Sequence, residues 1–470
     1  MLVIFVHGWS VTDTSTYGDL PKWLAQQADA QGLDLQVGHI YLGRYVSFVD
    51  TVTLDDVARA FDQALADTLP NGGKGQRFAC ITHSTGGPVV REWMDLYYRE
   101  RLGCCPLSHL VMLAPANHGS ALAQLGKERL SRIKSFFQGV QPGTRILDWL
   151  ELGSDQSWDL NESWLGYDCV SAGVFPFVLT GQKIDRQFYD ALNSYTGEPG
   201  SDGVVRVAGA NMNYTLLHLV QDGESLHVQR QQRSAKMALG VLPGRSHCGE
   251  KIGIMRSVTL ENAATHPTTH WVLRCLGVRN ASDYAQLSSE LDQVTAKTQA
   301  DEREEVVRHL IGKRTYITNR HTMAVFRFTD DRGNALTDYD LYLTAGPDYD
   351  DNELPEGFFV DRQRNQRNPG KLTYYLDYDV MDTGLKTASL GGHLGFRVKA
   401  RPEAGPEALA FYRQLDFRAT VAQVEQFLRP NETLMVHIVM QRCVDKTVCR
   451  MTPDLTPGPI SKTPVGELVK

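Results

Sequence analysis

Ser84 occupies a position where a serine could act as a nucleophile. The apolar run FACI (78–81) leads into THSTGG, and PVVREWMDLYYRER after it has the pattern of an amphipathic helix. A serine on a tight turn between strand and helix exposes its Oγ, and the amide of the next residue, Thr85, can donate to an oxyanion. Thr82 replaces the first glycine of the usual Gly-x-Ser-x-Gly pattern, where another small residue can serve. The segment predicts a nucleophile elbow, against the alternative of an ordinary turn with a solvated serine.

A second oxyanion donor is expected from LVIFVHGWS near the N-terminus, which reads as a strand followed by a loop. Gly8 lets the backbone approach a substrate closely, and Trp9 or the neighbouring amide can donate. We predict an oxyanion hole formed by Gly8, Trp9 and Thr85. His7 is expected to be a structural, hydrogen-bonded residue. In a fold with this kind of elbow, the catalytic residues follow in the chain order Ser, Asp, His, and the base comes after the last strand.

An alcohol is a poor nucleophile at pH 7 unless a base takes its proton, so an acid and a histidine are expected after Ser84. Asp202 lies in the loop segment TGEPGSDGVV, where a carboxylate could reach a histidine and hold its tautomer. Asp-Gly is also a strong turn signal, which is the structural alternative for Asp202. Asp185, after the segment FPFVLTG, is the second candidate for the acid.

Three histidines follow the later predicted strands and could be the base. His247 comes first, in the small-residue loop LPGRSHCGEK, which is how a base is presented at the carboxyl edge of a sheet. His266 and His270 are the alternatives, although THPTTHW is more typical of a helix start. The predicted triad is Ser84, Asp202 and His247. His218 and His227 are expected to be surface residues of an insertion.

The elements that must carry these residues alternate between strand and helix. The hydrophobic pattern predicts strands over 2–6, 35–42, 78–81, 109–114, 175–180, 203–208 and 238–242, with helices over 17–31, 54–69 and 89–101. Such alternation predicts a parallel sheet covered by helices on both faces, the α/β class.

The pattern changes after about residue 275. A charged helical stretch covers 282–311, and short strands that alternate apolar with polar residues follow from residue 320, as in AVFRFTD and KLTYYLDYDV. We expect a catalytic domain over 1–280, a helical connector over 281–319, an all-β, sandwich-like module over 320–452 and a flexible Pro-rich tail over 453–470.

An insertion over 119–174 has no clear place in the predicted sheet. Its first part, ALAQLGKERLSRIKSFF, has one apolar side and a basic remainder, and three tryptophans follow at 149, 158 and 164. The segment predicts either a core-packing helix with a solvated basic face or a lid that opens on an anionic lipid surface.

The composition excludes several classes of protein. A formal net charge of −7 over 470 residues does not favour nucleic acid as a partner. The eight cysteines form neither a disulfide framework nor a zinc motif, and the acidic clusters at 330–331 and 348–351 do not fit the EF-hand spacing. No metal or cofactor is therefore predicted. The apolar runs are too short to span a membrane, and residues 1–6 lack the features of a signal peptide, so synthesis in the cytoplasm is expected.

The motifs HGW, THSTGG, APANHGS and SDGVV, in this order, resemble those of the α/β-hydrolase lipases. The resemblance is greatest to the bacterial lipase and GPI inositol-deacylase-like branch, which includes phospholipase effectors of type VI secretion. It covers residues 1 to about 275 and implies an α/β-hydrolase fold with Ser84 as nucleophile and Asp202 as acid. His118 matches a segment that precedes the lid and is usually not catalytic.

The resemblance implies a serine lipase or phospholipase that hydrolyses acyl esters of membrane lipids. It further implies an antibacterial effector delivered by type VI secretion into the periplasm of a rival cell, with an immunity protein and a secretion-apparatus protein as partners. An intracellular carboxylesterase, an acyltransferase with the same triad and a binding protein without activity are the alternatives.

Overall fold

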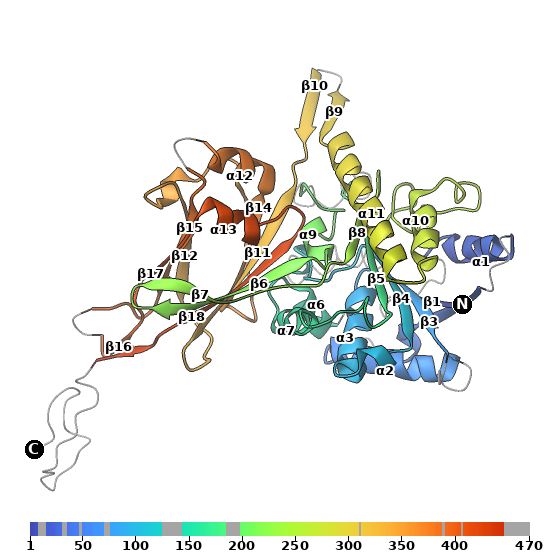
Figure 1. Ribbon diagram of the computed structural model, residues 1–470, viewed down its shortest axis with the longest axis horizontal. Helices are drawn as coiled ribbons and strands as arrows, with labels where there is room; N and C mark the ends of the chain where they lie inside the picture. Colours follow the sequence, from blue (N-terminus) through green and yellow to red (C-terminus); the bar gives the residue numbers. More distant parts are fainter. Residues whose placement is uncertain are drawn as a thin grey trace, which may run out of the picture.

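The structure is a computed structural model, and it describes residues 1–7, 16–30, 35–46, 49–69, 76–124, 143–184, 198–309, 312–387, 391–405 and 408–445. Two halves lie side by side, a helix-covered sheet and a second, largely helix-free sheet (Figure 1). The predicted fold class, an α/β-hydrolase domain followed by a β module, is confirmed.

The first sheet is parallel throughout and has the strand order β2-β1-β3-β4-β5-β8. Its strands are β1 (Leu2–His7), β2 (Gln36–Tyr41), β3 (Phe78–His83), β4 (Leu107–Leu113), β5 (Phe175–Thr180) and β8 (Ala238–Val241). The four inner strands read as nearly continuous apolar runs because helices cover both faces, so that all their side chains except those of Leu2 and His83 are buried.

Each face of this sheet has its own core (Figure 1). On one face pack α2 (Leu54–Thr68) and α3 (Gly86–Tyr98), and on the other pack α1 (Leu20–Ala30), α10 (Pro267–Leu276) and α11 (Ala281–Asp301). The region expected to be a connector therefore begins with a helix of the catalytic domain, because Tyr284, Leu287 and Leu291 of α11 are buried in this second core. The hairpin β9 (Glu304–His309) and β10 (Gly312–Ile317) follows α11, where a helix was expected.

The predicted strand over 203–208 is wrong. Residues 201–206 form a turn closed by a bridge between Ser201 and Arg206, and the short helix α9 (Val207–Ala210) follows. The turn forms because Asp202 Oδ1 accepts hydrogen bonds from the amides of Val204 and Val205, which a strand would have paired with a neighbour.

The second sheet is mixed and has the strand order β12-β15-β17-β7-β6-β18-β11-β14-β13. Its strands are β6 (Tyr214–Asp222), β7 (Ser225–Arg233), β11 (His321–Asp330), β12 (Tyr339–Ala345), β13 (Phe359–Arg364), β14 (Lys371–Asp377), β15 (Leu394–Ala400), β17 (Leu415–Ala419) and β18 (Thr433–Met440). The hairpin β6–β7 comes from within the first 280 residues, so it joins the β module although it precedes the predicted boundary. It carries His218, which is half-buried, and His227, which is exposed.

This sheet is sandwich-like because it folds over onto itself. Its two parts are joined at one paired position, Asp416 with Ser225, between β17 and β7. Side chains of strands that are not neighbours then meet in the interior, where the rings of Phe326 and Phe396 have centroids 5.4 Å apart. The helices α12 (Tyr378–Leu385) and α13 (Val421–Phe427) close this core.

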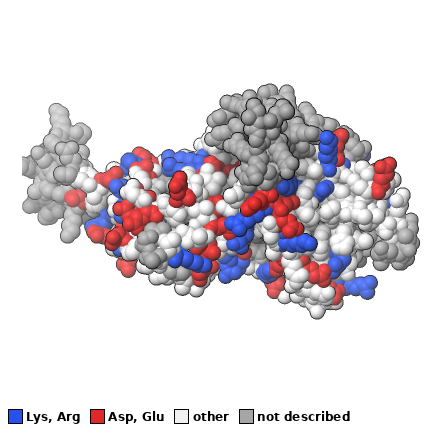
Figure 2. Space-filling model, turned by 90° about the horizontal axis from the view of Figure 1, so that it is seen from above, with Lys and Arg blue, Asp and Glu red and all other residues white. Residues whose placement is uncertain are grey.

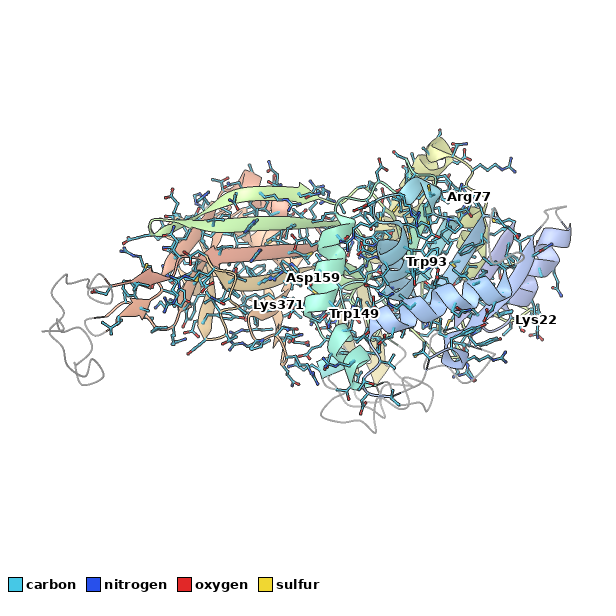
Figure 3. All side chains as sticks on the ribbon, turned by 90° about the horizontal axis from the view of Figure 1, so that it is seen from below. Lys22, Arg77, Trp93, Trp149, Asp159 and Lys371 are labelled. Atoms are coloured by element: carbon cyan, nitrogen blue, oxygen red, sulfur yellow. The ribbon has the colours of Figure 1, made fainter. Side chains whose placement is uncertain are left out.

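Of the insertion, the structure describes 119–124 and 143–174, and the longer of these parts packs in the interior. Its helices α6 (Thr144–Leu150) and α7 (Asp155–Trp164) contact α2 and α3, and Trp149, Trp158 and Trp164 are all buried. Figure 3 places Asp159 of α7 and Lys371 of β14 at the junction between the two halves. The alternatives of a core-packing helix and a lid concern the basic amphipathic segment, most of which lies outside the described residues, and both stay predictions.

On the face in Figure 2, the described residues mix both signs of charge. Acidic and basic side chains are interspersed over both halves of the face in Figure 2. Within the described ranges, no helix combines the length and the apolar character that crossing a bilayer requires. The predicted flexible tail, 453–470, lies outside the described residues.

Candidate active site

Ser84 lies on a strained turn between β3 and α3, as a nucleophile elbow requires. Its φ is +53°, a left-handed conformation that residues other than glycine rarely adopt. The Ser84 amide donates to the Leu113 carbonyl at 3.0 Å, which ties the turn to the end of β4. A Cβ at Gly86 would lie 3.2 Å from the Cβ of Thr82, so Gly86 leaves the room that the threonine at the first motif position needs.

Asp202 is fully buried, and its two carboxylate oxygens accept hydrogen bonds from different partners. Oδ1 accepts hydrogen bonds from the amides of Val204 at 3.0 Å and Val205 at 2.8 Å, which fix the carboxylate plane. Oδ2 accepts a hydrogen bond from Nδ1 of His247 at 2.9 Å. This arrangement holds His247 in the tautomer that leaves Nε2 able to accept a proton.

His247 follows β8 in a loop that is anchored to the Asp202 turn. Its amide donates to the Asp202 carbonyl at 3.0 Å, so backbone and side chain together join the two residues. His83, the residue before Ser84, packs its ring at a centroid distance of 4.6 Å from the His247 ring. His83 Nε2 donates to the His247 carbonyl at 3.1 Å, and burial together with the His247 imidazole lowers the pKa of His83 well below its usual value.

The structure therefore brings Asp202 and His247 into contact and places His83, next to Ser84, against His247. His83 was not singled out from the sequence, and its position beside the serine was the available signal. The other candidate for the acid, Asp185, lies outside the described residues.

The alternative histidines have other partners. His266 caps α10: its Nδ1 accepts from the Thr268 amide, and its Nε2 donates to Ser257 Oγ at 2.9 Å. His270 is exposed on the same helix, against Trp271. Neither of them replaces His247 at the buried carboxylate.

His7 has the structural role that the sequence suggested. A hydrogen bond of 3.1 Å joins its Nε2 to Nδ1 of His39, and its ring packs on Tyr41 at 4.3 Å. Burial and the neighbouring His39 lower the pKa of His7 to about 3, so the ring stays neutral. These contacts fix the carboxyl end of β1, which Gly8 and Trp9 follow in the sequence. Gly8 and Trp9 themselves lie outside the described residues.

Thr85 stands at the N-terminus of α3. The first amides of a helix have no carbonyl partner one turn earlier, and the helix dipole makes this end partly positive. The Thr85 amide is thus suited to stabilise negative charge beside Ser84. Among the described residues there is no cluster of three or more His, Cys, Asp or Glu side chains that could hold a metal ion.

A parallel sheet with a serine on a strand-to-helix elbow, and an acid and a histidine on later loops, defines the α/β-hydrolase class. The chain belongs to the family of phospholipase PlaB from Legionella pneumophila. It is 63% identical to that protein, with a TM-score of 0.93, and the match covers 99% of this chain and 98% of PlaB. A second structure, PlaB in complex with thio-NAD, matches with 60% identity and a TM-score of 0.91 over 99% of both chains.

The chain matches no protein-family model and no curated protein sequence. The match to PlaB extends over the β module as well as the α/β-hydrolase half, so both halves belong to the family. The predicted enzyme class, an ester hydrolase of the α/β-hydrolase lipases, is confirmed by this relationship.

Proposed function

We propose that this protein is a phospholipase and that Ser84, Asp202 and His247 are its catalytic triad. Ser84 Oγ attacks the acyl carbonyl of the lipid while Nε2 of His247 takes the hydroxyl proton. The amide of Thr85 and the loop with Gly8 and Trp9 stabilise the oxyanion. His247 then protonates the leaving alcohol. A water molecule, deprotonated by His247, releases the fatty acid and restores Ser84.

One observation carries this proposal: the buried hydrogen bond of 2.9 Å between His247 and Asp202, formed beside the serine elbow. A solvated turn aspartate would have no reason to be fully buried with one oxygen on an imidazole. The substrate class rests on the 63% identity to a phospholipase along the whole chain.

The proposal is tested by fatty acid release from vesicles of phosphatidylglycerol and of phosphatidylcholine. Ser84→Ala should lower the rate on the order of 10⁴-fold or more, because it removes the nucleophile. Ser289→Ala, at an exposed position of α11, is the matched control and should retain wild-type activity. Activity of Ser84→Ala within tenfold of wild type would refute the triad.

A soluble p-nitrophenyl ester separates the alternatives. Cleavage of this ester without release of fatty acid from vesicles would identify the protein as a carboxylesterase and not a phospholipase. Transfer of the acyl group to an added alcohol in preference to water would identify an acyltransferase.

The antibacterial role stays a prediction from the motif resemblance, together with type VI delivery, the immunity partner and the periplasmic site of action. Its test is to direct the chain to the periplasm of a sensitive bacterium with an added secretion signal. The role predicts growth arrest and loss of phospholipid with the wild-type chain and normal growth with Ser84→Ala. Equal growth of the two strains would contradict it.

A further inference from the structure

The turn that carries Asp202 rests on the β module through one buried arginine. Arg206, which closes this turn, is 2% exposed, and its Nε and Nη2 donate to the two carboxylate oxygens of Glu198 at 2.9 and 2.6 Å. Nη2 also forms an ion pair with Asp361 of β13. The guanidinium lies over the ring of Tyr375 of β14, with 4.1 Å from its central carbon to the ring centroid.

These contacts hold the guanidinium charge in a buried place. Burial would lower the pKa of Arg206, but Glu198, Tyr375 and Asp361 outweigh it, so that the pKa is raised. When a buried guanidinium contacts two carboxylates and an aromatic ring, these partners together fix the orientation of its plane and its N–H groups. Arg206 therefore joins the Asp202 turn, through its own backbone, to two strands of the second sheet.

The start of the turn also packs against the β module. Tyr375 Oη donates toward the carbonyls of Pro199 at 3.0 Å and Gly200 at 3.2 Å. Gly200 has a φ of +70°, and a Cβ there would lie 2.6 Å from both Tyr375 Oη and His321 Nδ1. The backbone can reach this surface only because residue 200 has no side chain.

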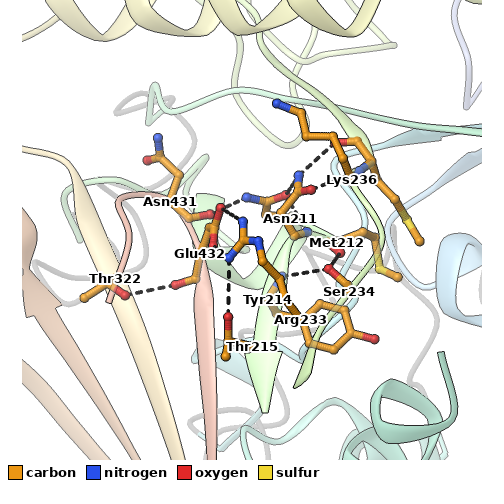
Figure 4. A network of polar contacts seen from close by, with 12 residues as sticks. Asn211, Met212, Tyr214, Thr215, Arg233, Ser234, Lys236, Thr322, Asn431 and Glu432 are labelled. Atoms are coloured by element: carbon orange, nitrogen blue, oxygen red, sulfur yellow. Dashed lines mark hydrogen bonds and ion pairs between the residues drawn. The ribbon is translucent and has the colours of Figure 1, made fainter. Parts of the chain in front are cut away.

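The segment after the turn is held by the same module. Thr433 Oγ1 of β18 donates to the Ala208 carbonyl of α9 at 2.9 Å. Asn211 Nδ2 donates to the Asn431 carbonyl at 2.6 Å, a contact that lies in the network of Figure 4. The β module thus contacts this segment both before and after Asp202.

We propose that Arg206, Tyr375 and Asp361 are positioning residues for the catalytic acid, so that the β module takes part in catalysis by holding the Asp202 turn against His247. The proposal rests on the triad of the proposed function. None of the three residues touches the substrate. They act through the backbone of 199–206, which aims Oδ2 of Asp202 at Nδ1 of His247.

Two mild substitutions test this proposal. Tyr375→Phe keeps the ring under Arg206 and removes only the hydroxyl contacts to the turn, and Asp361→Asn removes one charge of the Arg206 pair. Asp416→Asn is the matched control, because Asp416 pairs with Arg397 within the β module and is 27% exposed, against 26% for Asp361.

We expect kcat for a soluble p-nitrophenyl ester to fall about 10- to 100-fold in Tyr375→Phe and Asp361→Asn, with KM unchanged, since a misplaced catalytic group costs on this order. Inactivation of Ser84 by a fluorophosphonate should slow by the same factor, because it also depends on His247. Asp416→Asn should keep the wild-type kcat, whatever its melting temperature.

The proposal is overturned if kcat and the inactivation rate of both variants stay within twofold of Asp416→Asn. It is equally overturned if kcat falls only in proportion to the fraction of unfolded protein, which the thermal unfolding curve of each variant gives. A failure of the triad is distinguished by Ser84→Ala: if that variant keeps its activity, the proposed function fails first. A failure of the lipid substrate leaves the test intact, because it uses the soluble ester.

Discussion

At the scale of single residues, Asp202 combines two tasks that an asparagine could only half perform. In Asp202→Asn, the side-chain oxygen could still accept from the amides of Val204 and Val205, but the amide nitrogen would present hydrogens to Nδ1 of His247. The imidazole would then adopt the wrong tautomer. We expect kcat to fall on the order of 10⁴-fold, measured with a soluble ester, while the melting temperature stays near that of wild type. A loss of less than tenfold would rule out this role for Asp202.

Alanine substitutions at Gly200 and Gly223 distinguish the effect of backbone strain from that of close packing. Gly200→Ala should lower the melting temperature more than Gly223→Ala does. Both positions have a positive φ, +70° and +62°, which alanine tolerates poorly, but a Cβ at Gly223 would meet no atom within 4 Å, whereas one at Gly200 would collide with Tyr375 and His321. Thermal unfolding of the two variants provides the comparison. Equal losses would show that the Asp202 turn is not packed tightly on the β module.

The residues of the proposed triad could be predicted from the sequence because their types and chain order are typical of the chemistry. Ser84 lies in a recognisable turn, Asp202 in an Asp-Gly loop, and His247 at the expected place in chain order. Arg206 was missed, because an arginine within the apolar stretch GVVRVAGA reads as the polar face of a strand. Only the fold shows that Tyr375, some 170 residues away along the chain, stacks on it.

At the scale of elements, β18 and β6 lie side by side and stack two histidines, His437 and His218, with ring centroids 4.7 Å apart. Burial, Arg327, His218 and Lys371 together lower the pKa of His437 from 6.5 to about 3. The unfolded chain takes up a proton here as the pH falls below 6.5, whereas the folded protein does so only near pH 3. The contribution of His437 to stability is therefore lost between these two values.

His437→Gln should therefore lose less unfolding free energy than wild type between pH 7 and pH 4.5, because it has no proton to take up. Urea unfolding at the two pH values measures the difference. Asp416→Asn serves as the control, because it lies in the same module and changes no histidine. A loss in His437→Gln equal to that of wild type would contradict a neutral, half-buried His437 ring.

Elements with a strong local pattern were predicted well, as the bounds of β1, β5 and α2 show. Those decided by distant partners were not. The hairpin β6–β7 pairs with β18, some 200 residues later in the chain, and no local signal assigns it to the second sheet. Residues 203–208 have the alternation of a strand, but the Asp202 carboxylate captures the amides that a strand would use.

At the scale of the whole molecule, the two halves share one interior. Met323, Val325, Tyr375 and Met435 of the β module belong to the same buried cluster as Trp93 and Met94 of α3. Figure 3 shows Trp93 and Trp149 on the side of this shared interior that belongs to the catalytic half. The β module is therefore built onto the catalytic domain, and the predicted boundary near residue 280 follows the chain but does not separate the two sheets.

In the proposed triad, the fold makes Ser84 reactive by assembling residues 84, 202 and 247. This reactivity can be measured by treating the folded chain with a fluorophosphonate and locating the modified peptide by mass spectrometry. We expect one phosphonate on Ser84 in the folded protein and none after unfolding in urea, because an isolated serine is a poor nucleophile at pH 7. A modified residue other than Ser84, or a folded protein that takes up no phosphonate, would contradict it.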